Sequence, residues 1–141
     1  MGVRAAAVAL ALTALPLAGC SGGSAFDVTV GDCFNTPSVD EDGVLGGVDV
    51  ISCSQPHDSE LYFEYDLTLP AYDEAAITAD IQNRCLEEFL VYVGVTWLES
   101  DYNYYALSPT VERWGMGDRK VSCALKSRDG KSSGSAQGSG G

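Results

Sequence analysis

The residues with the clearest chemical potential lie around His57, the single histidine of the chain. Asp58 and Glu60 follow closely, so the sequence offers a general base or proton switch with carboxylates beside it. Catalysis needs several groups placed together, however, and no Gly-x-Ser-x-Gly elbow between a predicted strand and a predicted helix accompanies this histidine. We therefore interpret His57 as a turn residue bonded to a neighbouring carboxylate or carbonyl. We predict that the protein is not an enzyme, with a His57-centred envelope enzyme as the alternative.

Cys20 closes an N-terminal segment that has the order of a secretory signal. Arg4 supplies a positive start, residues 5–15 are almost entirely apolar, and Leu-Ala-Gly-Cys ends at Cys20. This ending is similar to the lipobox of bacterial lipoproteins, which implies a diacylglyceryl group with palmitate-type chains on the Cys20 thiol and removal of residues 1–19. We expect residues 20–25 to be a lipid anchor and spacer on the outer face of the cell membrane. An ordinary secretory signal is the alternative.

The other four of the five cysteines are expected to form two disulfides, because the compartment outside the cytosol is oxidising. Three pairings are possible. Cys33 and Cys53 occupy neighbouring strand-like segments, whereas Cys85 and Cys123 occupy inward positions of a helix and a strand, so we favour Cys33–Cys53 and Cys85–Cys123. Zinc bound by cysteines and His57 is the alternative, but no Cys-x-x-Cys pair offers the usual spacing. We predict no metal and no cofactor.

An aromatic stretch supplies the candidate binding residues. Exposed rings could stack on sugars or anchor a protein partner, and burial in the core is the alternative. The candidates are Tyr102, Tyr104, Tyr105 and Trp114, with Trp97 nearby.

Acidic residues dominate the charge of the chain. Lysine and arginine number 8 against 20 aspartates and glutamates, which gives a net charge of −12. This charge repels nucleic acid and anionic lipid headgroups, so nucleic acid is excluded as a partner and attachment to the membrane must be covalent. The acidic loop 38–42 could hold Ca²⁺, but Ser38 stands where an EF-hand needs its first ligand, and we interpret it as a solvated loop.

A helix with clear start and stop signals is the most regular predicted element. Asp73 is a suitable N-cap, and Gly94 is a suitable stop. Between them, apolar residues recur at steps of four, four, four and three, as one face of a helix requires. This stripe consists of Ile77, Ile81, Cys85, Phe89 and Tyr92, joined by Leu86, Leu90 and Val93.

Short strand-like segments surround this helix. They cover residues 26–30, which lead through a turn into residues 33–34, and residues 48–53, 59–67, 103–107 and 119–126, with a turn at 110–118. In the segment 59–67, Leu61, Phe63 and Tyr65 are expected to share one face. We predict an α+β fold, in which one long helix packs across an antiparallel sheet of about four or five strands. Residues 26–126 would form the domain, followed by a disordered Gly/Ser tail at 127–141.

A series of short motifs occurs in a fixed order along residues 31–125. The motifs are Gly31-Asp32-Cys33-Phe34, Val50-Ile51-Ser52-Cys53, Pro56-His57-Asp58-Ser59-Glu60, a helical Cys85 with Phe89, Tyr92 and Gly94, Pro109 to Trp114, Gly117-Asp118-Arg119 and Val121-Ser122-Cys123. This order resembles the septum formation domain of actinobacterial envelope proteins. The resemblance implies an extracytoplasmic domain, often tethered to the membrane and associated with division septum formation.

The implied extracytoplasmic location and the lack of a recognisable catalytic motif together predict a class of function. We expect a non-enzymatic binding or scaffold module of the cell envelope, whose partners would be envelope or division proteins or cell-wall polymer. Besides the His57-centred enzyme, a small-ligand carrier with a pocket near Phe89 and Tyr92 is a further alternative.

Overall fold

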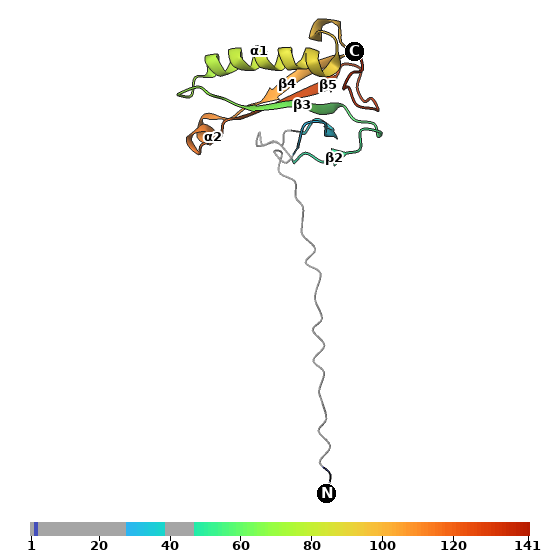
Figure 1. Ribbon diagram of the computed structural model, residues 1–141, viewed down its shortest axis with the longest axis horizontal. Helices are drawn as coiled ribbons and strands as arrows, with labels where there is room; N and C mark the ends of the chain where they lie inside the picture. The colour runs from blue at the N-terminus through green and yellow to red at the C-terminus, as the bar shows by residue number, and fades with distance from the viewer. Residues whose placement is uncertain (1, 3–27, 39–46) are drawn as a thin grey trace.

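A five-stranded antiparallel sheet with one long helix across a face forms the domain (Figure 1). The computed structural model describes residue 2 and residues 28–38 and 47–141. The strand order is β2-β1-β3-β5-β4. The elements are β1 (Cys33–Phe34), β2 (Val50–Ile51), β3 (Ser59–Asp66), α1 (Glu74–Val93), the 3-10 turn η1 (Trp97–Glu99), β4 (Tyr102–Leu107), α2 (Val111–Gly115) and β5 (Lys120–Ser127). The predicted α+β fold is confirmed.

Helix α1 begins and ends where its capping residues predict. The Asp73 carboxylate accepts a hydrogen bond from the Ala76 amide at 3.0 Å. Gly94 adopts a φ of 95°, and its amide donates to the Leu90 carbonyl at 3.0 Å. The buried residues of the helix are Ile77, Cys85, Phe89 and Val93.

Two leucines of α1 do not belong to the buried stripe. Leu86 is 36% exposed and Leu90 is 46% exposed, so the prediction that they join the core is wrong. Each follows a fully buried residue, Cys85 or Phe89. One residue rotates about 100° around a helix of 3.6 residues per turn, which carries both leucines to the side of the stripe.

Apolar residues form one cluster on each face of the sheet. The larger lies under α1 and includes Phe89, Val121 and Leu125. A smaller cluster contains Leu61, with Tyr105 packed against it. An irregularity between Leu61 and Phe63 breaks the alternation of β3, so the predicted shared face of Leu61, Phe63 and Tyr65 is wrong. Phe63 and Tyr65 pack against the cluster under α1 instead.

Two disulfides brace this arrangement and have the predicted pairing. Cys33–Cys53 joins β1 to the segment that follows β2. Cys85–Cys123 joins the middle of α1 to β5 through two fully buried cysteines. The second bridge therefore fixes the helix to the centre of the sheet.

The C-terminal segment packs on the domain, and the predicted disordered tail at 127–141 is wrong. Ser127 is the last residue of β5. Ser132 pairs with His57 in an isolated β-bridge, and Ala136 is 1% exposed. The Gly138 and Gly140 amides donate to carbonyls of the last two residues of α1, at 2.8 and 3.0 Å. Figure 1 shows the C-terminus beside this end of α1. The backbone amides of small residues thus bind groups that the helix leaves without partners.

Some sequence predictions fall on residues that the structure does not describe, and others differ from it. Cys20, residues 26–27 and residues 39–42 of the acidic loop lie outside the described residues. Residues 28–30, predicted as part of a strand, are not in one. Within the predicted turn 110–118, the Thr110 hydroxyl accepts from the Arg113 amide at 3.3 Å and begins the short helix α2.

Candidate functional site

The only histidine is held inside a turn. His57 is 3% exposed, and its Nδ1 lies 2.8 Å from the Gln55 carbonyl oxygen. Its backbone amide and carbonyl both pair with Ser132, at 2.9 and 2.8 Å. These contacts agree with a structural role for His57 and join its backbone to the C-terminal segment.

One group of potential metal ligands occurs among the described residues. Donor atoms of Cys33, His57 and Glu60 all lie within 4.8 Å of one another, and the three residues are buried. The Cys33 sulfur is bonded to Cys53, however, so it cannot act as a thiolate ligand. The chemistry of this donor set therefore does not fit a zinc ion.

The Glu60 carboxylate of this group accepts hydrogen bonds from the protein itself. Glu60 is 2% exposed. Its oxygens accept hydrogen bonds from the Tyr92 hydroxyl at 2.7 Å, the Ala136 amide at 2.7 Å and the Ser135 hydroxyl. Burial and the bond to the carboxylate raise the pKa of Tyr92, which stays protonated as a donor. Glu60 thus connects β3, α1 and the C-terminal segment.

Asp58 forms a second polar cluster beside His57. Burial favours a higher pKa for this carboxyl group, but hydrogen bonds outweigh it and lower the pKa. The donors to Oδ1 are the Thr36 amide at 2.6 Å and the hydroxyls of Thr36 and Ser59, both at 2.8 Å. The ionised form of Asp58 is therefore the form that the fold favours.

We expect Asp58→Asn to lower the free energy of unfolding at pH 7 by about 1 kcal/mol, because it removes the charge from these hydrogen bonds. A carboxyl group with a lowered folded pKa stabilises above its unfolded pKa, and this contribution is lost as the pH falls through the folded value. The difference between the variant and wild type should therefore shrink below about pH 4. Urea denaturation between pH 2 and 7 measures it, with Asp49→Asn, an exposed aspartate, as the control. A difference that is constant with pH would contradict this account.

The structure does not bring the four candidate binding aromatics together on one surface. Tyr102 and Tyr104 pack against the cluster under α1, whereas Tyr105 packs on the opposite face of the sheet. Trp114 is 9% exposed and lies edge-on to Tyr72, with ring centroids 5.8 Å apart. Alternation along β4 separates the neighbouring tyrosines, and packing buries the tryptophan.

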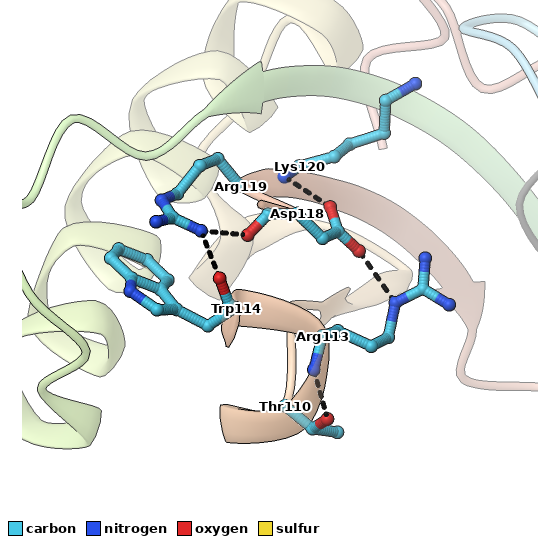
Figure 2. A network of polar contacts seen from close by, with 6 residues as sticks. All are labelled: Thr110, Arg113, Trp114, Asp118, Arg119 and Lys120. Atoms are coloured by element: carbon cyan, nitrogen blue, oxygen red, sulfur yellow. Dashed lines mark hydrogen bonds and ion pairs between the residues drawn. The ribbon is translucent and has the colours of Figure 1, made fainter. Parts of the chain in front are cut away.

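A polar network that the sequence analysis missed joins α2 to β5 (Figure 2). Arg113 Nε lies 2.7 Å from Asp118 Oδ2, and the other oxygen of Asp118 accepts from the Lys120 amide at 3.0 Å. The Arg119 guanidinium donates to the Trp114 carbonyl at 2.8 Å and lies 3.5 Å from the centre of its ring. The sequence did contain a signal for this network, because three of the 8 lysines and arginines of the chain lie between residues 113 and 120.

A hollow of about 170 Å³ lies beside this network. Arg113, Asp118 and Lys120 contribute to its wall. Asp118 pairs with Arg113, and Glu64 lies 3.6 Å from the Lys120 ammonium. Opposite charges therefore balance at this hollow, and the network positions the connection between α2 and β5.

The sequence model of a family described as septum formation matches residues 30–140. No curated protein and no solved structure matches the chain. Among the described residues, no helix has the length and apolar character needed to cross a membrane. The match covers more than half of the 141 residues and includes both disulfides. The chain therefore belongs to the septum formation family.

Proposed function

We propose that the protein is an exported lipoprotein, anchored through Cys20 to the outer face of the cell membrane, whose domain is a non-enzymatic binding or scaffold module acting in septum formation. The observation that carries this proposal is the family match over residues 30–140. The signal-like residues 1–19 and the Leu-Ala-Gly-Cys sequence supply the argument for the anchor.

The disulfides support an extracytoplasmic location for the domain. All four cysteines after Cys20 are paired, in Cys33–Cys53 and Cys85–Cys123. Reducing systems of the cytosol keep most thiols free, whereas exported proteins retain such bridges. A net charge of −12 disfavours nucleic acid as a partner. The proposed partners are envelope or division proteins or cell-wall polymer.

A His57-centred enzyme has weaker support. The His57 ring is buried, and one of its nitrogens lies at the Gln55 carbonyl. The neighbouring carboxylates of Asp58 and Glu60 accept hydrogen bonds from the protein itself. A substrate would have to replace these internal hydrogen bonds to reach the carboxylates, so we favour binding over catalysis.

A ligand carrier also has weaker support, because side chains fill the space between α1 and the sheet. Phe89 is fully buried and lies edge-on to Tyr62, with ring centroids 5.8 Å apart. The Tyr62 hydroxyl donates to the Cys85 carbonyl at 2.8 Å. On the other face, the hollow beside Tyr105 has about 20 Å³, whereas small-molecule sites usually exceed about 300 Å³.

The anchor can be tested with Cys20→Ala in the full chain. We expect the wild type to incorporate labelled fatty acid, to fractionate with the membrane and to collect at division septa. The variant should lose the label and leave the membrane fraction, because the acylated thiol is gone. Ser21→Ala is the matched control and should behave as the wild type. Equal labelling of all three proteins would refute the anchor, and an even distribution of the wild type around the cell would refute the septal role.

A further inference from the structure

An exposed apolar groove lies where α1 ends and η1 begins. It has a volume of about 240 Å³ and is lined by Leu86, Leu90, Thr96, Trp97 and Leu98. Leu98 is 81% exposed. Leu86 and Leu90 are one helical turn apart, so they form a ridge along one side. These leucines are the residues of the predicted stripe that the core leaves at the surface.

The far wall of the groove is fixed by its own contacts. The Trp97 ring lies edge-on to Tyr104, with centroids 5.9 Å apart, and its Nε1 donates to the Asn103 side chain at 3.0 Å. The Arg128 guanidinium donates to the Trp97 carbonyl at 3.2 Å. A surface held in this way loses little conformational freedom when a partner binds.

Acidic residues predominate in the chain segment that forms the groove, and the Arg128 guanidinium contacts its far wall at Trp97. Residues 86–101 contain four acidic residues and neither lysine nor arginine. Glu99 accepts from the Thr96 hydroxyl at 2.7 Å, which places a carboxylate at the lining of the groove. Arg84, the one basic residue of α1, lies over the Tyr65 ring at 4.0 Å. An apolar floor with an acidic border complements a partner that combines apolar and basic side chains.

Size and charge select among possible occupants. The groove is smaller than the usual site for a drug-sized molecule, but it suits anchoring side chains of a protein segment. A second copy of the chain would bring another net charge of −12 to this acidic border. Anionic headgroups would be repelled for the same reason.

We infer that this groove docks a short helical segment of another envelope protein, which inserts two large apolar side chains one turn apart and carries lysine or arginine beside them. The inference rests on the proposed role as a binding module and names its contact surface. Leu90 and Leu98 would contact the anchors, while Glu87 and Glu99 would face the basic residues.

A photocrosslinking residue placed at Leu98 in the full chain tests the inference in the intact envelope. Met116, 84% exposed at the end of α2, is the matched control position. We expect about tenfold more protein adduct at position 98, mapped by mass spectrometry to a segment with paired apolar and flanking basic residues. A synthetic peptide of that segment should bind the purified protein, with Kd raised about tenfold by Leu90→Asp or Leu98→Asp. Met116→Asp should change Kd less than about twofold, and about 0.5 M salt should weaken binding.

Several results would overturn the inference. They are equal or absent adducts at the two positions, adducts only with lipid or with a second copy of this chain, and a peptide whose binding neither aspartate variant changes. Melting temperatures equal to wild type would show that the variants fold, and Leu98→Asp provides a substitution at a mostly exposed side chain. If septal location and Cys20 acylation persist while the adduct is absent, the groove is wrong and the proposed function stands.

Discussion

Replacing Cys85 and Cys123 together by alanine is expected to lower the free energy of unfolding by about 4 kcal/mol. The bridge spans a sequence separation of 38 residues, so its removal returns considerable conformational entropy to the unfolded chain. Both cysteines are fully buried and connect α1 to β5. Urea denaturation followed by circular dichroism measures the loss.

The other disulfide provides the comparison for this experiment. Cys33–Cys53 spans 20 residues, and its double alanine variant should lose about 3 kcal/mol. Helix α1 should separate from the sheet more readily only in the Cys85/Cys123 variant, as hydrogen exchange along the helix would report. A smaller loss for Cys85/Cys123 than for Cys33/Cys53, or normal exchange in α1, would contradict this view of the core.

Glu60→Ala is expected to lower the free energy of unfolding by about 3 kcal/mol. Its removal leaves the Tyr92 hydroxyl and the Ala136 amide without their acceptor in a buried position. We expect the C-terminal segment to detach before the domain unfolds, because Glu60 is the side chain on which it converges. Hydrogen exchange at residues 134–140, together with urea denaturation, measures both effects.

Two variants sharpen the Glu60 experiment. Glu87→Ala, at an exposed position of α1, should change the free energy of unfolding by less than about 0.5 kcal/mol. Glu60→Gln retains one acceptor oxygen and should lie between the alanine variant and wild type. Unchanged exchange at residues 134–140 in Glu60→Ala would show that other contacts hold the segment.

The parts of the fold that local chemistry determines could be predicted from the sequence. Asp73 and Gly94 bound α1 as expected, since a cap acts through neighbouring backbone groups. The disulfide pairing followed from placing Cys85 and Cys123 on inward faces. Alternation also places Tyr104 and Tyr105 of one strand on opposite faces, so their grouping as one site overlooked a signal that was present.

Features that depend on distant residues could not be predicted in this way. The Gly/Ser-rich composition of the C-terminal segment is typical of disorder, yet Ala136 is buried against Glu60, 76 residues earlier. The residues near Ala136 in the sequence do not indicate that it contacts the Glu60 carboxylate. The exposure of Leu86 and Leu90 likewise depends on which neighbours the helix meets.

The hydrogen bonds that join β3 and α1 to residues 135–140 affect the order in which a nascent chain acquires its structure. A polypeptide that emerges N-terminus first presents β3 and α1 long before residues 135–140 are available. Until those residues arrive, the Glu60 carboxylate lacks the Ser135 and Ala136 donors, and the last carbonyls of α1 lack theirs. The domain therefore completes its structure only after residues 135–140 have emerged, and a chain that stops before them would expose a buried acid to water.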